Sequence, residues 1–295
     1  MIRFLYALLV LAALALPGAA SAREPAFQPT RFSVTVEGEG PDIILIPGLM
    51  TGRRVWDESV RSLGGRYRVH RLQIAGFAGE PAGGNAEGPI LDGVVEELRL
   101  YIAANRLQRS KLVGHSIGGL FALMLAARHP DDVERALIVD ALPFYGLLFG
   151  PNATAATVTP NAAALRDTIL GMSEEAWRAQ QPATLATMIR TEAARTPILA
   201  DAMASDRSVV ARAVYEDMIT DMRPALADLG TPLTVAYAVN EYATEQRFGG
   251  LVRSSFAGAP GIRFVPVEAS YHFIMLDQPA RFAAILDDFL AGDGD

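Results

Sequence analysis

Short apolar runs alternate with amphipathic segments along most of this chain, and this alternation restricts the fold more than any other feature. The clearest run, Asp42-Ile43-Ile44-Leu45-Ile46, ends at Pro47-Gly48 and is typical of a buried parallel strand. Further strands are predicted at 32–36, 67–74, 111–113, 136–139, 233–238 and 262–267. The clearest helix is predicted at 90–107, where apolar residues recur on one face. The pattern favours an α/β fold, a mostly parallel central sheet with helices on both faces.

The alternation stops after Asp140 and resumes near Leu233. The intervening segment is rich in alanine and methionine, has no convincing strand, and carries loop signals at Gly150-Pro151-Asn152 and Thr159-Pro160-Asn161. We therefore predict a helical cap insertion at 142–223. It separates a first part of the core, 23–141, from a second part, 224–295.

The first 22 residues have the features of a secretory signal peptide. An apolar stretch from Phe4 to Leu16 is followed by Pro17-Gly18 and by Ala20-Ser21-Ala22, which predicts cleavage after Ala22. The apolar stretch is shorter than the roughly 20 residues that a membrane span needs, so no stable membrane anchor is expected. The predicted location is outside the cytoplasm, either periplasmic or secreted.

Composition narrows the choice of partners and cofactors. The chain has no cysteine, four histidines and a formal net charge of −7. Nearly all basic residues are arginine, and they form no basic run, so nucleic acid is not expected as a partner. No group of carboxylates or histidines has metal-ligand spacing, and no cofactor or metal is predicted. A small molecule is the expected partner, and the oligomeric state stays open.

The sequence Gly-His-Ser-Ile-Gly-Gly at 114–119 follows a predicted strand and precedes a predicted helix. In this G-x-S-x-G arrangement the serine lies on a tight strand-to-helix turn with its hydroxyl exposed. Ser116 is therefore the predicted nucleophile. A serine hydroxyl is weak until a base removes its proton, and His272, after the last predicted strand, is the predicted base.

Hydrolysis of an acyl substrate also needs backbone N–H groups that stabilise the developing oxyanion. One is expected from Ile117, the residue after the nucleophile. The other is expected from Leu49, in the loop Pro47-Gly48-Leu49 after the strand at 42–46.

Three motifs, Leu-Ile-Pro-Gly-Leu-Met, Val-Gly-His-Ser-Ile-Gly-Gly and Tyr-His-Phe-Ile-Met-Leu-Asp-Gln-Pro, resemble the oxyanion loop, nucleophile turn and histidine loop of the α/β-hydrolase superfamily. The resemblance covers nearly all of the chain after residue 22. It departs from the usual pattern in two places, with Pro47-Gly48 where many members have His-Gly and Gln73-Ile74-Ala75-Gly76 where many have Asp-x-x-Gly.

The resemblance leaves two positions open for the acid that orients the histidine. In many members the acid follows the strand that corresponds here to 233–238, and Glu241 stands there. In others it follows the preceding strand, and Asp140 stands there. Both fit the order serine, acid, histidine. We favour Asp140 slightly over Glu241.

The predicted function is hydrolysis of a carboxylic ester through an acyl-enzyme. Lactone, amide or C–C bond hydrolysis and perhydrolysis are alternatives on the same residues, and a non-catalytic binding protein is a further alternative, because a fold does not determine a reaction. Apolar side chains of the predicted cap are expected to line an acyl pocket: Phe144, Leu147, Leu148, Phe149 and Met172. The substrate itself and its acyl chain length are not predicted.

Overall fold

The structure is a computed structural model that describes residues 27–107 and 109–292. The predicted signal peptide at 1–22 lies outside these residues. Within them, no helix combines the length and the apolar character needed to cross a membrane.

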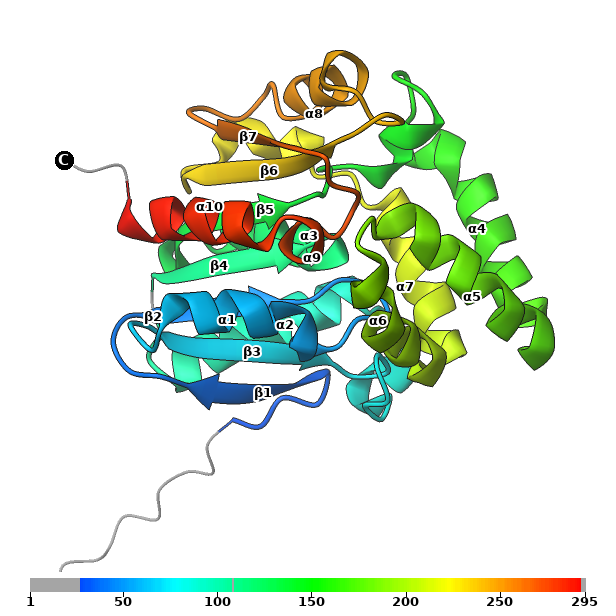
Figure 1. Ribbon diagram of the computed structural model, residues 1–295, viewed down its shortest axis with the longest axis horizontal. Helices are drawn as coiled ribbons and strands as arrows, with labels where there is room; N and C mark the ends of the chain where they lie inside the picture. The colour runs from blue at the N-terminus through cyan, green and yellow to red at the C-terminus, as the bar shows by residue number, and fades with distance from the viewer. Residues whose placement is uncertain (1–26, 108, 293–295) are drawn as a thin grey trace, which may run out of the picture.

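A seven-stranded sheet forms the centre of the described chain, in the order β1-β3-β2-β4-β5-β6-β7 (Figure 1). Its strands are β1 (Phe32–Glu37), β2 (Asp42–Ile46), β3 (Arg68–Ile74), β4 (Ser110–His115), β5 (Val133–Val139), β6 (Leu233–Val239) and β7 (Arg263–Glu268). Only the pairing of β1 with β3 is antiparallel. The prediction of a mostly parallel sheet is confirmed.

Both faces of the sheet are buried, which explains why the inner positions of its central strands are mostly apolar. In β2, Ile44 and Ile46 belong to one hydrophobic cluster, whereas Ile43 and Leu45 belong to another on the opposite face. Two clusters form because successive side chains of a strand point to opposite faces of the sheet.

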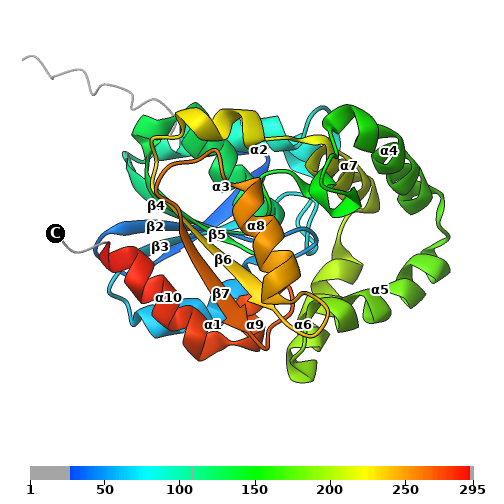
Figure 2. The ribbon, with the colours of Figure 1, turned by 90° about the horizontal axis from the view of Figure 1, so that it is seen from above.

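Helices cover both faces of the sheet (Figure 2). The first cluster includes residues of α2 (Leu91–Ala104), α3 (Ile117–Arg128) and α8 (Gly250–Ser255). The second includes residues of α1 (Asp57–Leu63), α9 (Ile274–Asp277) and α10 (Pro279–Ala291). Short 3₁₀ segments, η1 (Arg53–Trp56), η2 (Gly83–Ala86), η3 (Pro130–Asp132), η4 (Tyr145–Phe149) and η5 (Arg223–Asp228), and a π-helical turn, η6 (Glu245–Gly249), complete the description.

Four helices between β5 and β6 lie beyond one end of the sheet (Figures 1 and 2). They are α4 (Ala155–Gly171), α5 (Glu174–Met188), α6 (Glu192–Ala204) and α7 (Arg207–Ile219). They fall within the predicted cap at 142–223, whose boundaries, like those of the two core parts, remain predictions. We call α4–α7 the cap helices.

One local prediction was wrong. Thr159-Pro160-Asn161 was expected to form a loop, but Pro160 lies inside α4. A proline inside a helix removes one backbone hydrogen bond and costs about 3 kcal/mol. Tertiary packing offsets this cost, since Val158 and Ala162 are buried against Met218 of α7. Such packing is not visible in a local sequence signal.

Candidate active site

Ser116 lies on a strained turn between β4 and α3. Its backbone has φ 56° and ψ −127°, and residues other than glycine rarely adopt such a positive φ. The turn is held by the Ser116 N–H, which donates to the carbonyl of Val139 at 2.9 Å. A strained turn of this kind is typical of a nucleophilic serine at the end of a sheet strand.

The glycines that flank Ser116 are required by close backbone contacts. A Cβ at Gly114 would lie 2.1 Å from the carbonyl oxygen of Gly118. A Cβ at Gly118 would lie 2.5 Å from the carbonyl oxygens of Ile46 and Pro47. The start of α3 therefore packs directly against the end of β2, which no residue larger than glycine would allow.

His272 follows β7, and its ring is paired with Asp140. The Nδ1 atom of His272 lies 2.7 Å from Oδ2 of Asp140. The other carboxylate oxygen of Asp140 accepts a hydrogen bond from the Ala238 N–H at 2.8 Å. The Asp140 N–H donates to the carbonyl of Ala236 at 2.7 Å. Asp140 is thus fixed at both backbone and side chain, and it can hold the histidine ring in one orientation.

Ser116 and His272 line the same cavity. In the described part of the chain, no hydrogen bond joins the Ser116 hydroxyl to His272. Hydrogen bonds between a nucleophile and its base are often long before substrate binds and shorten in the reacting complex. The arrangement therefore brings the predicted serine, histidine and Asp140 to one site, with the serine–histidine contact still open.

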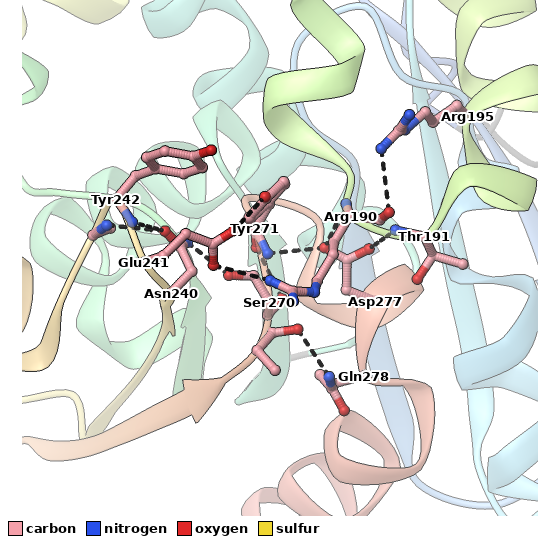
Figure 3. Close-up of polar contacts among 12 residues, drawn as sticks. Arg190, Thr191, Arg195, Asn240, Glu241, Tyr242, Ser270, Tyr271, Asp277 and Gln278 are labelled. Atoms are coloured by element: carbon pink, nitrogen blue, oxygen red, sulfur yellow. Dashed lines mark hydrogen bonds and ion pairs between the residues drawn. The ribbon is translucent and has the colours of Figure 1, made fainter.

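Glu241, the other position considered for the acid, belongs to a different group of polar contacts (Figure 3). Its carboxylate accepts hydrogen bonds from the Tyr271 hydroxyl at 2.8 Å and from Arg190 at 3.0 Å. Arg190 lies in the loop between α5 and α6, so this group joins the cap helices to the histidine loop. We call Arg190, Glu241, Tyr271 and Asp277 the cap junction.

Asp277, at the end of α9, is a member of the cap junction that the sequence analysis missed. Its carboxylate accepts from the backbone N–H of Arg190 at 3.1 Å, of Thr191 at 2.8 Å and of Tyr271 at 2.9 Å (Figure 3). Tyr271 immediately precedes His272, so Asp277 fixes the histidine loop and the cap loop to each other. Asp277 lies in the motif Tyr-His-Phe-Ile-Met-Leu-Asp-Gln-Pro, which predicted the histidine loop. Its contacts with the cap could not be predicted from this motif, because they are made with a loop more than 80 residues earlier.

The two predicted oxyanion donors lie beside the nucleophile turn. Ile117 is the first residue of α3, so its N–H has no acceptor within that helix. Leu49 lines the cavity together with Ser116. The loop before it is close to the nucleophile, because a Cβ at Gly48 would lie 3.2 Å from the Ser116 Cβ. Both residues therefore lie beside Ser116, and the role of their N–H groups as oxyanion donors stays a prediction.

His115 is fully buried beneath the site. Its Nε2 atom lies 3.1 Å from the carbonyl oxygen of His272. Burial, together with the nearby His272, lowers the pKa of His115 well below its usual value. His115 is therefore neutral near pH 7, and it supports the histidine loop without adding positive charge to the site.

The cavity has a volume of about 390 Å³, and its wall is mostly apolar. All four cap helices contribute to it, through residues such as Leu165, Leu185, Ile198 and Met218. Of the five cap residues expected to line an acyl pocket, only Leu148 does so. The others were wrong as pocket residues. Phe144 and Leu147 form a small core with α4 and α7, Met172 packs against the larger core, and Phe149 is exposed.

Asp217 of α7 also lines the cavity, although no motif in the sequence marks it as a site residue. Burial raises the pKa of its carboxyl to about 7, although the nearby His272 acts to lower it. No local pattern distinguishes Asp217 from the other acidic residues of the cap, so only the packing of α7 reveals it. Within the described residues, no cluster of three or more histidine or carboxylate side chains could hold a metal ion.

Residues 43–285 match the profile of the Alpha/beta hydrolase family, and the chain belongs to this family. The pimeloyl-acyl-carrier-protein methyl ester esterase of Aeromonas hydrophila is 36% identical over 116 residues, which are 39% of this chain and 44% of that protein. An esterase of the same name from Edwardsiella ictaluri is 25% identical over 252 residues, 85% of this chain and 93% of that protein. In two further proteins of this name, from Aliivibrio salmonicida and Vibrio atlanticus, the match spans 38% and 39% of the protein. The chain thus matches less than half the length of these two relatives and of the one from Aeromonas hydrophila.

Solved structures share the fold. An enol-lactonase from Burkholderia xenovorans superposes with a TM-score of 0.71 and 21% identity, covering 88% of this chain and 96% of its own. An esterase from Exiguobacterium antarcticum superposes with a TM-score of 0.73 and 15% identity, covering 88% of this chain and 96% of its own. At this level of identity the likeness concerns the fold alone.

Proposed function

We propose that this protein is a serine hydrolase that cleaves a carboxylic ester through an acyl-enzyme. The observation that carries the proposal is the 2.7 Å contact between Asp140 and His272, in the same cavity wall as Ser116 on its strained turn. An ester is favoured over the alternative bonds because several relatives by sequence are named methyl ester esterases.

In the first half of the proposed reaction, the Ser116 Oγ attacks the ester carbonyl while Nε2 of His272 takes the hydroxyl proton. The oxyanion accepts hydrogen bonds from the N–H groups of Leu49 and Ile117. The C–O bond to the alcohol then breaks, and the alcohol leaves with the proton from His272. The acyl group remains on Ser116.

In the second half, a water molecule attacks the acyl-enzyme and gives a proton to His272. The second oxyanion uses the same two N–H groups. The bond to Ser116 Oγ breaks, the serine recovers its proton from His272, and the carboxylic acid departs. Asp140 holds the Nδ1 tautomer and stabilises the imidazolium in both halves, without itself taking a proton.

Labelling by a fluorophosphonate tests the nucleophile directly. Wild-type protein should be labelled and should hydrolyse short 4-nitrophenyl esters, and Ser116→Ala should lose both properties. Ser62→Ala, on the exposed side of α1, is the matched control and should keep both. Folded protein that neither reacts with the reagent nor turns over any acyl substrate would contradict the proposal and favour a binding protein instead.

We also propose that the protein is exported and that residues 1–22 are removed. The support is the apolar stretch from Phe4 to Leu16 and the Ala20-Ser21-Ala22 site in the sequence. N-terminal sequencing of the protein expressed in its native host should begin at Arg23. A mature protein that retains Met1 in the cytoplasm would contradict export.

A further inference from the structure

Among the described residues, the cavity wall carries more acidic than basic side chains. Two carboxylates line it, Asp140 and Asp217, and its wall contains no lysine or arginine. Asp140 is paired with His272. Neither oxygen of Asp217 has a hydrogen-bond or ion-pair partner in the described protein, although the residue is half-buried in the cavity wall. A carboxylate in such a place is costly unless it is paired.

The basic side chains of the neighbouring helices are engaged elsewhere. Arg212, on the same helix as Asp217, donates to backbone carbonyls in the segment 85–88. Arg207 donates to the carbonyl of Met172, and Arg166 of α4 pairs with Asp167 at 2.8 Å. None of them contacts Asp217. The cap therefore leaves this carboxyl to whatever enters the cavity.

Among the described residues, none of the other titratable groups in the cavity wall forms a hydrogen bond or ion pair with Asp217. They are Tyr145 of η4, His115 of β4, Tyr237 of β6 and His272 after β7. Burial and the charge of Asp217 raise the pKa of Tyr145, so this phenol stays neutral near pH 7. His115 is neutral for the reason given above. His272 is already paired with Asp140 through its Nδ1 atom.

We propose that the esters cleaved at this site carry a cationic amino group, which Asp217 binds. The inference rests on the proposed ester hydrolysis and names its substrate class. A bound cation would replace the missing partner of Asp217, and in an apolar wall the attraction between opposite charges is stronger than in water. An anionic group in the same position would face two carboxylates, so acidic acyl groups are disfavoured by the same geometry.

Matched pairs of esters test this inference. In the first pair the acyl group is 6-(trimethylammonio)hexanoyl or its neutral isostere 7,7-dimethyloctanoyl, both as 4-nitrophenyl esters. In the second pair the alcohol is choline or its neutral isostere 3,3-dimethylbutanol, both as butanoates. The two members of a pair differ in charge but hardly in shape. The ratio of their kcat/KM values therefore isolates the charge and cancels the contribution of the shared serine chemistry.

Wild-type enzyme should prefer the cationic member of at least one pair by about tenfold or more. Asp217→Asn should abolish this preference, by lowering kcat/KM for the cationic ester relative to that for its neutral isostere by about tenfold or more. Asp167→Asn removes the same charge from an exposed position of α4 and should leave the preference intact. The preference should also decline as the pH falls below about 7, where Asp217 becomes protonated.

The outcomes separate this inference from the proposed function. If neutral esters are cleaved and neither pair shows a cationic preference, or if Asp217→Asn retains the preference, the inference is wrong and ester hydrolysis stands. If no ester of either pair is cleaved by folded wild-type protein, the proposed function itself fails.

Discussion

Asp140 and His272 are 132 positions apart in the sequence, and a 2.7 Å hydrogen bond joins them at the end of the sheet. The same aspartate accepts from Ala238 of the neighbouring strand β6. The acid is thereby fixed to two adjacent strands, and the histidine comes from the loop after a third.

Asp140→Asn should lower kcat by about 10⁴-fold, the size of loss seen when the acid of a serine protease triad is changed to its amide. The physical reason is that an amide no longer selects the tautomer in which His272 can accept the serine proton. Glu241→Gln is the matched control and should change kcat less than about tenfold, since Glu241 contacts Arg190 and Tyr271 and not His272. Both variants are to be assayed on one short-chain ester, with folding checked by circular dichroism. A large loss of kcat in Glu241→Gln, with kcat of Asp140→Asn close to that of the wild type, would instead assign the triad acid to Glu241.

Gly118→Ala should destabilise the fold by about 1–3 kcal/mol or more, the usual cost of forcing extra atoms into a packed interior. The new Cβ would lie 2.5 Å from the carbonyl oxygens of Ile46 and Pro47, and backbone atoms cannot easily move aside. Gly171→Ala is the control, because a Cβ at the end of α4 meets no atom within 4 Å. Its free energy of unfolding in urea should stay unchanged or rise by less than about 1 kcal/mol. Equal stability of the two variants would argue against the close packing of α3 on β2.

Asp277→Ala should lower both stability and kcat. It leaves three backbone N–H groups, of Arg190, Thr191 and Tyr271, without their acceptor, which we expect to cost about 1 kcal/mol or more. The histidine loop is then free to move, so kcat should fall more than KM rises, and Asp277→Asn should restore part of it. Asp288→Ala is the control, because it breaks only an exposed pair between α10 and Arg263 of β7. A purely structural role would appear as lost stability with kcat unchanged.

The stability of the wild-type protein should depend on pH through Asp217. The pKa of this carboxyl is about 7 in the folded protein against 3.8 when unperturbed, so between these values the folded state holds a proton that the unfolded state has lost. Stability therefore falls as the pH rises through this window. Asp217→Asn removes the effect, and its gain in unfolding free energy over wild type should be larger at pH 8 than at pH 5, by about 1 kcal/mol or more. Asp167→Asn should show no such pH dependence. A gain that is the same at both pH values would mean that the fold does not raise the pKa of Asp217.

Several elements of the fold and site could be predicted because their signals are local. The strand at 42–46 was expected with the bounds that the structure gives it, since a parallel strand buried on both faces is a nearly continuous apolar run, as Ile43 to Ile46 are here. The turn at Ser116 was equally visible, because Gly114 and Gly118 are demanded by contacts within a few residues or with the adjacent strand. The sequence also determined that a histidine after the last strand, His272, would reach the same end of the sheet.

Other features depended on contacts between segments far apart in the chain, and only the tertiary structure decided them. Asp140 and Glu241 both satisfied the order of residues along the chain, and the choice between them rests on which carboxylate the His272 ring faces. Pro160 signals a loop locally, yet packing of α4 on α7 keeps it inside a helix. Asp217 resembles any surface acid until α7 turns it into the cavity. Periodicity reports which face of an element is buried, but what that face meets is determined by the packing of the whole chain.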